Sequence, residues 1–363
     1  APALIFTFWG RLLVFLRCND REKVNYFCRI DSPRPLPMSK ILLTDGSGFV
    51  GQYLIPQLLR QGYQVVALCR SSRAAEKVSA LGAAPVMDDL THLSQAIAAA
   101  LKSCAVVVHS AAYIDFNYDR DKFFAINVVA TKSLLRLAKE NGVKRFLYLS
   151  AAPVVPGSPI KNLTEDQAAA GLPRDLYPRT KALAEKAVLV ANEAGFLTLA
   201  LRPPAIWGPD NHHLEEVLDR VRAGQWRWIG GGHQVLSTIH INNLVAAILA
   251  ALERGRGGEA YFVTDGDQRS MRTSFSAIFR AHGLEPTDKE FPLGLATFLA
   301  RGFDLLWRTF GIKSRPPIPP LAIRLMAQEF SVSDAKARRE LNYQNVIHFE
   351  EGIKKINPSI SPR

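Results

Sequence analysis

The chain has 363 residues and a formal net charge of +12. This length can bury a full core, and the charge suggests an anionic partner such as a phosphorylated cofactor, a membrane surface or a nucleic acid. Because the lysines and arginines are scattered, without a dense basic run or a zinc-finger spacing, we expect no nucleic-acid binding. Cys18, Cys28, Cys69 and Cys104 form no CxxC pair or metal-ligand spacing, so we expect no metal site and reduced thiols in a cytoplasmic protein.

Residues 1–37 differ in character from the rest of the chain. The apolar stretch "ALIFTFWGRLLVFL" contains Arg11 and is shorter than the ~20 residues that a membrane-spanning helix needs. The proline-rich stretch "DSPRPLP" follows, and Met38 stands directly before the first predicted strand. We therefore expect Met38 to be the natural start and residues 1–37 to be an atypical leader outside the fold. The alternative is an amphipathic anchor, which would make the protein membrane-associated.

From Lys40 onward, short apolar runs alternate with longer helical patterns. The runs predict strands over residues 40–44, 64–69, 84–87, 105–110, 145–150 and 197–202. Between them, helices are expected over 49–60, 74–81, 93–101, 121–141 and 177–194. This alternation is typical of βαβ units and predicts an α/β fold, a Rossmann-type doubly wound parallel sheet over residues 38–202. A cofactor crevice is then expected at the carboxyl ends of the strands.

After Arg202 the alternation loosens. A helix is predicted over residues 243–253 and a strand over 259–264, and the remainder of residues 203–363 indicates a smaller, mostly helical substrate-binding region with some segments returning to the sheet. Two C-terminal stretches, "LGLATFLARGFDLLWRTFGI" and "LAIRLMAQEF", combine large apolar residues with arginines. They are either core or lid helices, or a surface that accepts a lipid-like substrate or rests on a membrane.

A glycine-rich turn lies between the first predicted strand and the first predicted helix. Gly46, Gly48 and Gly51 satisfy GxGxxG, in which the glycines permit a tight turn, approach of the backbone to a pyrophosphate and close helix packing. The amino terminus of the helix offers unpaired N–H groups to the phosphates. We predict that the cofactor-binding turn consists of Gly46, Ser47, Gly48, Phe49, Val50 and Gly51.

Asp45 stands where a phosphate is expected to come close. A carboxylate ~6 Å from a phosphate costs about 1 to 3 kcal/mol if it points inward, which weakens binding by about tenfold to a hundredfold. Aspartate tolerates left-handed backbone angles better than most residues, so the turn can still form. We expect either a working site of reduced affinity or a side chain that turns away to solvent or to a basic neighbour.

The end of the second predicted strand bears on the choice of cofactor. An acidic residue is typical there when the ribose hydroxyls of NAD are bound, but this chain has Cys69 and Arg70, with Arg73 nearby. A guanidinium can pair with the 2′-phosphate of NADP. NADP is therefore preferred over NAD, with solvated arginines at a helix start as the alternative.

The stretch "YPRTK" places Tyr177 and Lys181 four residues apart, on one face of a predicted helix. A nearby ammonium favours the phenolate, so we expect Lys181 to lower the pKa of Tyr177 towards neutrality. The tyrosine would then act as acid and base at a hydroxyl or carbonyl group.

Together with the glycine turn, these motifs resemble the extended short-chain dehydrogenase/reductase, or NAD-dependent epimerase/dehydratase, superfamily. Within it, the chain is similar to the branch of 3β-hydroxysteroid dehydrogenases and sterol-4-carboxylate 3-dehydrogenases. The resemblance extends from about Ser39 to Ile356. It rests on "TDGSGFVG", "DDL", "VVVHSAA", "NVVAT", "YPRTK", "RPPAIWGP", "STIHINNL" and "ARRELNY".

The resemblance implies a role for each matching position. Tyr177 would be the proton donor or acceptor, and Lys181 would hold the nicotinamide ribose. A homodimer through the helices that contain Asp121 and Tyr177 is also implied. The remaining implied roles are adenine contacts at Asp89 and Leu90, a cofactor wall at Ala111 and Ala112, loop support at Asn127 and nicotinamide contact at Pro203.

Two departures from the family pattern affect the expected activity. Asp45 replaces a glycine, and Ala152 stands where the family carries a catalytic serine or threonine. Losing one such hydrogen-bond donor costs ~10² to 10³ in rate. Ser150 lies two residues earlier on the same side of the strand and is our candidate to supply the hydroxyl as a third catalytic residue.

We therefore expect an NAD(P)-dependent oxidoreductase that interconverts a secondary alcohol and a ketone on a bulky apolar substrate, sterol-like or lipid-like. One alternative is a nucleotide-sugar epimerase or dehydratase, in which Arg269 and Arg272 would bind phosphate. The other is a cofactor-binding protein with weak or no catalysis, because of Asp45 and Ala152.

Overall fold

The computed structural model describes residues 39–168, 170–211 and 214–356. The atypical leader and Met38 lie outside the described residues, so the expectations for them stay predictions.

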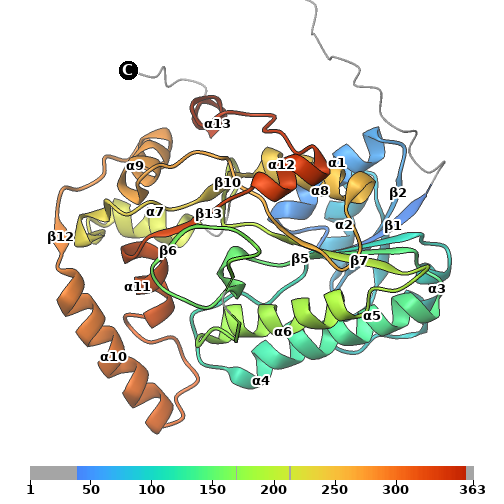
Figure 1. The fold of residues 1–363 in the computed structure, drawn as a ribbon, viewed down its shortest axis with the longest axis horizontal. Helices are drawn as coiled ribbons and strands as arrows, with labels where there is room; N and C mark the ends of the chain where they lie inside the picture. The colour runs from blue at the N-terminus through green and yellow to red at the C-terminus, as the bar shows by residue number, and fades with distance from the viewer. Residues whose placement is uncertain (1–38, 169, 212–213, 357–363) are drawn as a thin grey trace, which may run out of the picture. The chain divides into compact units, whose positions relative to one another are not determined.

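The main sheet is built from short apolar strands. They are β1 (Lys40–Thr44), β2 (Gln64–Cys69), β3 (Ala84–Met87), β4 (Val106–His109), β5 (Arg145–Leu149), β7 (Leu197–Arg202) and β11 (Ala260–Phe262). In the described part of the chain, these seven strands are all parallel and lie in the order β11-β7-β5-β4-β1-β2-β3 (Figure 1). Continuous apolar strands of this kind suit a parallel sheet that is covered on both faces. The predicted Rossmann-type doubly wound sheet is confirmed.

Helices cover both faces of this sheet (Figure 1). One face carries α1 (Phe49–Arg60), α2 (Ser72–Ala80), α8 (Ile241–Arg254) and α12 (Ala335–Leu341). The opposite face carries α3 (Gln95–Lys102), α5 (Thr131–Glu140) and α6 (Leu176–Val190). Neighbouring residues of a strand point to opposite faces, so Leu43 packs in the α1 cluster while Leu42 packs in the α5 cluster.

Several predicted elements have the bounds that the structure shows, namely β1, α1, β2, β3 and β7. The predicted helix over 121–141 is confirmed as one helical stretch, but its π-helical middle was not predicted. It consists of α4 (Arg120–Phe123), a π-helical segment (Phe124–Ala130) and α5. Asn127 lies in the π-helical segment and hydrogen-bonds a loop far from it in sequence, a tertiary contact that apolar periodicity cannot indicate. Such segments are frequent at functional sites.

The C-terminal half is mainly helical, as predicted. It contains α7 (Glu215–Arg222), α8, α9 (Met271–Ala281), α10 (Leu293–Thr309), α11 (Pro320–Ala327), α12 and α13 (Phe349–Ile356). None of the helices in the described residues is both long and apolar enough to span a bilayer.

Short parallel strand pairs were not predicted. They are β8 (Ala205–Trp207) with β10 (Thr238–His240), β9 (Trp228–Ile229) with β12 (Glu290–Phe291), and β6 (Ile160–Leu163) with β13 (Phe330–Val332). Strands of this length carry too little alternation to be recognised, and their partners are distant in sequence.

The strand order places a topological switch point between β1 and β4. The chain runs outward from β1 to β2 and β3 and then returns to β4 on the other side of β1. Ligands of open α/β sheets bind at such a point, outside the carboxyl ends of the strands. The glycine turn follows β1 directly, so it lies at this edge.

A buried hydrogen-bond chain joins the two strands at the switch point. Thr44 Oγ1 lies 2.8 Å from His109 Nδ1, and His109 Nε2 lies 2.9 Å from Thr131 Oγ1. The Thr131 hydroxyl donates to the carbonyl oxygen of Asn127, so Nε2 must carry the ring hydrogen and Nδ1 must accept from Thr44. Burial lowers the pKa of His109 to about 3, which keeps the imidazole neutral.

We predict that Thr44→Val lowers the free energy of unfolding by about 2 kcal/mol. Thr44 Oγ1 accepts hydrogen bonds from the backbone N–H groups of Ser110 (3.1 Å) and Ala111 (3.0 Å), and valine leaves both groups and His109 without this partner. Urea unfolding measures the change. Thr273→Val, which alters an exposed hydroxyl, should cost less than about 0.5 kcal/mol. Equal losses in the two variants would contradict the assigned role.

Candidate functional site

The glycine turn is packed so tightly that side chains are excluded at two of its positions. A Cβ added at Gly51 would lie 2.3 Å from the carbonyl oxygen of Gly46, and one added at Gly46 would lie 3.0 Å from Cβ of Ala67. Gly48 precedes α1, and no side chain caps its N–H groups. Phe49 and Val50 are buried in the core, so only their backbone can face a ligand. The turn therefore leaves the N–H groups at the start of α1 without a side-chain partner, which is the arrangement that binds anions at helix starts.

Asp45 has the left-handed backbone that the sequence allowed, with φ of 57°. A Cβ built on Gly48 would lie 2.3 Å from Asp45 Oδ2, so the carboxylate lies against the glycine turn. Asp45 is solvent-exposed on the side of the cavity that it lines, while nearby protein atoms partly bury its carboxylate. This burial raises the pKa of Asp45 to about 6, against the opposing effect of Arg70. The carboxylate thus lies against the glycine turn, and the expected working site of reduced affinity stays a prediction.

A cavity of about 770 Å³ extends from this turn along the carboxyl ends of the strands. It is lined by six predicted cofactor residues: Ser47, Arg70, Asp89, Leu90, Ala111 and Ala112. Asp89 Oδ1 accepts hydrogen bonds from the backbone N–H (2.7 Å) and the hydroxyl (2.6 Å) of Thr91, and these bonds lower the pKa of Asp89. Leu90 is buried and supplies an apolar wall. Arg70 is exposed at the cavity, whereas Arg73 does not line it.

Two further residues line this cavity that the sequence did not indicate. Lys122 Nζ lies 4.3 Å from the ring centroid of Tyr113, and both face the cavity. Asn127 holds the backbone of Tyr113 in place: its Oδ1 accepts from the N–H of Tyr113 at 2.7 Å, and its Nδ2 donates to the carbonyl oxygen at 3.0 Å. No spacing rule could have found Lys122, because the loop before α4 places it.

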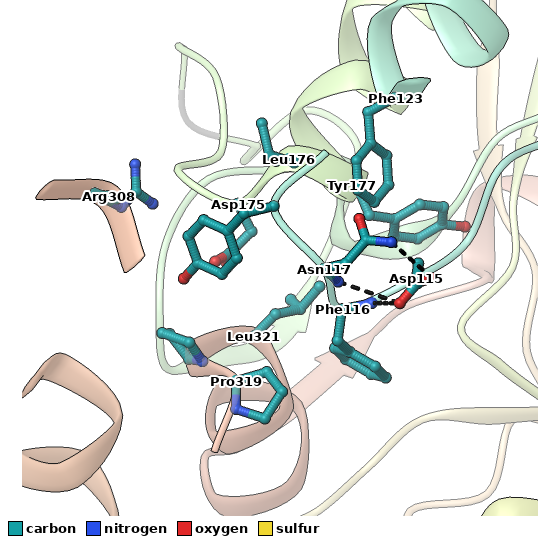
Figure 2. Close-up of a pocket in the computed structure, with 12 residues that line it drawn as sticks. Asp115, Phe116, Asn117, Phe123, Asp175, Leu176, Tyr177, Arg308, Pro319 and Leu321 are labelled. Carbon is teal, nitrogen blue, oxygen red and sulfur yellow. Dashed lines mark hydrogen bonds between the residues drawn. The ribbon is translucent and has the colours of Figure 1, made fainter. Parts of the chain in front are cut away.

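The predicted catalytic pair lies at the start of α6. Tyr177 is half-buried and lines a small cavity of about 30 Å³ (Figure 2). Lys181 is 2% exposed, donates to the carbonyl oxygen of Leu149 at 2.6 Å and lies 4.1 Å from the ring centroid of Tyr148. Burial raises the pKa of Tyr177 and lowers the pKa of Lys181 to about 7. The expectation that Lys181 lowers the pKa of Tyr177 is therefore wrong for this structure, in which burial alone sets the direction of the shift.

Ser150 and Ala152 follow β5 at the same edge of the sheet. Ser150 is 4% exposed, and its Oγ has no hydrogen-bond partner among the residues that the structure describes. Ala152 is fully buried, and its N–H donates to the carbonyl oxygen of Pro203 at 2.8 Å. Pro203 is thereby fixed beside the end of β5. A buried hydroxyl without a partner is costly unless a ligand or water satisfies it.

The C-terminal helices close over Tyr177. Arg308 of α10 and Leu321 of α11 line the Tyr177 cavity (Figure 2). Tyr118 donates its hydroxyl to Asp304 of α10, and Arg308 Nε donates to the same carboxylate at 2.8 Å. The C-terminal half therefore supplies the far wall of this cavity.

An apolar cavity of about 280 Å³ lies next to this position. Its wall includes Pro178, the neighbour of Tyr177, and Pro153, the neighbour of Ala152. Leu321, Leu325 and Phe330 contribute further apolar surface. Arg324 also lines it and forms an ion pair with Asp175, which precedes α6. The arrangement can accept an apolar group beside the tyrosine.

Comparison with known families agrees with this geometry. Residues 42–293 match the model of the 3-beta hydroxysteroid dehydrogenase/isomerase family. The chain belongs to this family. The superfamily that the sequence motifs indicated is thereby confirmed, and the chain is an oxidoreductase of the extended short-chain dehydrogenase/reductase type.

Two enzymes are among the relatives of this family member. One is the 4-hydroxy-2-methyl-3-oxo-4-farnesyl-3,4-dihydroquinoline-1-oxide ketoreductase of Stigmatella aurantiaca, 34% identical over 316 residues, which cover 86% of this chain and 94% of the relative. The other is the decarboxylating sterol-4-alpha-carboxylate 3-dehydrogenase of Dictyostelium discoideum, 30% identical over 329 residues, with coverage of 88% and 100%.

Among solved structures, the UDP-glucuronic acid 4-epimerase of Bacillus cereus in complex with NAD is similar, with a TM-score of 0.68 and 19% identity. The match covers 88% of this chain and 99% of the epimerase. At this identity the likeness shows the fold alone.

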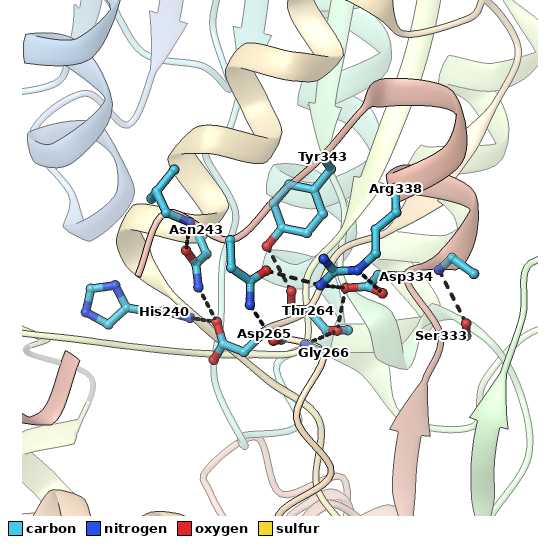
Figure 3. A network of polar contacts seen from close by, with 12 residues as sticks. His240, Asn243, Thr264, Asp265, Gly266, Ser333, Asp334, Arg338 and Tyr343 are labelled. Atoms are coloured by element: carbon cyan, nitrogen blue, oxygen red, sulfur yellow. Dashed lines mark hydrogen bonds and ion pairs between the residues drawn. The ribbon is translucent and has the colours of Figure 1, made fainter. Parts of the chain in front are cut away.

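The C-terminal motifs of this family member meet at Asp265, which is 6% exposed (Figure 3). Its carboxylate accepts hydrogen bonds from Trp207 Nε1 (2.7 Å), the N–H of His240 (2.8 Å) and Asn243 Nδ2 (2.7 Å). The Tyr343 hydroxyl donates to the neighbouring carbonyl oxygen of Thr264 at 2.8 Å. The motifs "RPPAIWGP", "STIHINNL" and "ARRELNY" therefore build one structural network.

The two arginines proposed for a nucleotide-sugar phosphate are already paired. Arg269 lies 2.6 Å from Asp267 and 2.8 Å from Glu350. Arg272 lies 2.7 Å from Asp288 and 3.0 Å from Glu290. Neither arginine lines the cavities around Tyr177 or the glycine turn. The two arginines are therefore not placed to bind the phosphate of a nucleotide sugar, which was the feature that favoured the epimerase or dehydratase alternative.

We predict that Asp265→Ala lowers the free energy of unfolding by about 3 kcal/mol, because the buried donors of Trp207, His240 and Asn243 lose their acceptor. Chemical denaturation measures the loss. Asp267→Ala, which removes a more exposed carboxylate paired with Arg269, should change stability by less than about 0.5 kcal/mol. A loss at Asp265 no larger than that at Asp267 would contradict this role.

Proposed function

We propose that this enzyme interconverts a secondary alcohol and a ketone on a bulky apolar substrate, sterol-like or lipid-like, with a nicotinamide dinucleotide as cofactor. The proposal is carried by the placement of the glycine turn, the 770 Å³ cavity and the Tyr177–Lys181 pair at the carboxyl edge of one sheet. The two named relatives, a ketoreductase and a 3-dehydrogenase, support this type of reaction.

The residues around the glycine turn fit a dinucleotide. The backbone at Gly48 and the uncapped start of α1 suit a pyrophosphate, and Leu90 offers an apolar wall to an adenine. Arg70, exposed at the cavity, suits a 2′-phosphate, which is why we propose NADP as the preferred form over NAD. Asp89 does not favour NAD, since one of its carboxylate oxygens is engaged by Thr91.

The dinucleotide would supply or accept the hydride. Tyr177 would donate its hydroxyl proton to the carbonyl oxygen during ketone reduction and take it back in the reverse direction. Because burial raises its pKa, Tyr177 is protonated at neutral pH and is suited to act as an acid. Lys181 fixes α6 to the end of β5 through the carbonyl oxygen of Leu149. The unpartnered hydroxyl of Ser150 would supply the second hydrogen bond to the reacting oxygen.

The surface of α10 supports an apolar, lipid-like substrate. Leu295, Phe298, Leu305 and Phe310 of this region are 47%, 74%, 67% and 71% exposed. Arg308 of the same helix lines the Tyr177 cavity. Exposed apolar side chains beside a site are typical of surfaces that meet lipids, so we propose that α10 also provides a peripheral contact with a membrane.

We predict that Tyr177→Phe lowers kcat by about 10² to 10⁴, since it removes the proton donor. Absorbance of NADPH, followed with a panel of 3-keto sterols and long-chain β-keto acids, measures the rate. Dinucleotide affinity, measured by fluorescence, should stay close to that of the wild type. Tyr63→Phe, a half-buried tyrosine after α1, is the matched control and should keep full activity. A wild-type rate in Tyr177→Phe would rule out the assigned proton donor.

We also predict that Arg70→Ala raises the Kd for NADPH about tenfold to a hundredfold more than the Kd for NADH, because only NADPH carries the 2′-phosphate. Fluorescence titration of both nucleotides gives the ratio of the two constants. Arg73→Ala, an exposed arginine outside the cavity, should leave that ratio unchanged. An unchanged ratio in Arg70→Ala would argue against the NADP preference.

A further inference from the structure

We propose that the Asp45 carboxylate occupies the position of a phosphate at the glycine turn, so that dinucleotide binding is coupled to the uptake of a proton by Asp45. This inference rests on the proposed function, because it concerns the same cofactor site. It assigns a role to the residue that departs most clearly from the family pattern.

The geometry places the Asp45 carboxylate at the point where a pyrophosphate is expected to bind. Gly48 is the second glycine of GxGxxG, the one whose missing side chain lets the backbone approach the pyrophosphate. In this chain the space beside Gly48 is taken by Asp45, whose Oδ2 would lie 2.3 Å from a Cβ built there. A pyrophosphate bound in the usual way therefore meets the Asp45 side chain directly.

The backbone of Asp45 cannot carry the side chain away. The residue has φ of 57°, and its carbonyl oxygen accepts the N–H of Gly48 at 3.1 Å. Residues 45–48 are thus closed into a tight turn that packs on Gly51 and Ala67. Only rotation of the side chain or neutralisation of its charge can relieve the repulsion of a phosphate.

The surroundings favour neutralisation. No hydrogen bond to the Asp45 carboxylate is formed by the part of the chain that the structure describes, and burial raises the pKa of Asp45 to about 6. The other titratable groups of the cavity come from several elements: Arg70 and Cys69 at the end of β2, Asp89 after β3, Tyr113 after β4 and Lys122 in α4, with the buried His109 behind β4.

Of these groups, Arg70 opposes protonation of Asp45, and the neutral His109 carries no charge near neutral pH. Asp89 stays ionised because its pKa is lowered by Thr91. Asp45 is therefore the carboxylate of this cavity that titrates near neutral pH.

The sign of the coupling follows from these charges. At pH 7 and above, Asp45 is mainly ionised in the free protein, and a bound phosphate favours its protonated form. Dinucleotide affinity is therefore highest below pH 6, where Asp45 is protonated in both states, and falls as the pH rises, until Asp45 is ionised in both states. The repulsion between two charges at this distance corresponds to a change of about tenfold to a hundredfold in Kd.

The experiment compares the wild type with Asp45→Asn and Asp45→Gly. Both replacements suit a left-handed backbone, so both should fold, which thermal unfolding verifies. NADH is the probe, because it lacks the titrating 2′-phosphate of NADPH. Fluorescence titration from pH 6 to 8.5 gives Kd, and calorimetry in two buffers of different ionisation enthalpy gives the protons taken up on binding.

For the wild type we expect Kd to rise by about fivefold to fortyfold over this range, with uptake of about 0.4 to 0.8 proton at pH 7. Both variants should bind more tightly at pH 8.5 and lose this dependence. Lys181, whose pKa is lowered to about 7, is present in all three proteins, so any slope it contributes remains in the variants and can be subtracted.

The outcomes separate the two proposals. If the wild type and both variants bind NADH with the same pH dependence and the same proton uptake, the role of Asp45 is overturned while the cofactor assignment stands. If none of the three binds NADH or NADPH at millimolar concentration, the proposed function is overturned and the inference fails with it. A wild type that binds independently of pH would also overturn the coupling.

Discussion

The hydrogen bond between Thr44 and His109 joins β1 and β4 at the point where the chain changes direction across the sheet, and the cofactor site depends on this junction. Because this hydrogen bond holds the two strand ends together, the glycine turn after Thr44 and the loop that begins at Ser110 border one cavity. The neutral state of His109, a result of its burial, keeps a positive charge out of the core at this point.

Burial is also the common cause of the charge properties around the site. It raises the pKa of Asp45 and Tyr177 and lowers that of Lys181. Burial thus favours the uncharged form of each of these three side chains. Such an environment disfavours charged side chains. This suits proton transfer from a neutral tyrosine as well as protonation of Asp45 beside a phosphate.

Two parts of the C-terminal half are held in place in different ways. The C-terminal motifs form a buried network around Asp265 that fixes the C-terminal half to the sheet. The wall over Tyr177, in contrast, comes from α10 and α11, and is held by polar contacts such as that of Asp304 with Tyr118 and Arg308. The proposed specificity for an apolar substrate would therefore depend on α10 and α11.

Local patterns of apolar runs, glycines and helix periodicity were enough to predict the parallel sheet, the bounds of strands such as β1, the GxGxxG turn and the Tyr177–Lys181 spacing. The departures from the family at Asp45 and Ala152 were also visible in the sequence. The folded chain was needed to place the Asp45 carboxylate against the glycine turn, to bring Lys122 into the cavity wall and to give the direction of the pKa shift at Tyr177. Those properties depend on burial and on contacts between residues far apart in the chain, and neither leaves a periodic trace in the sequence.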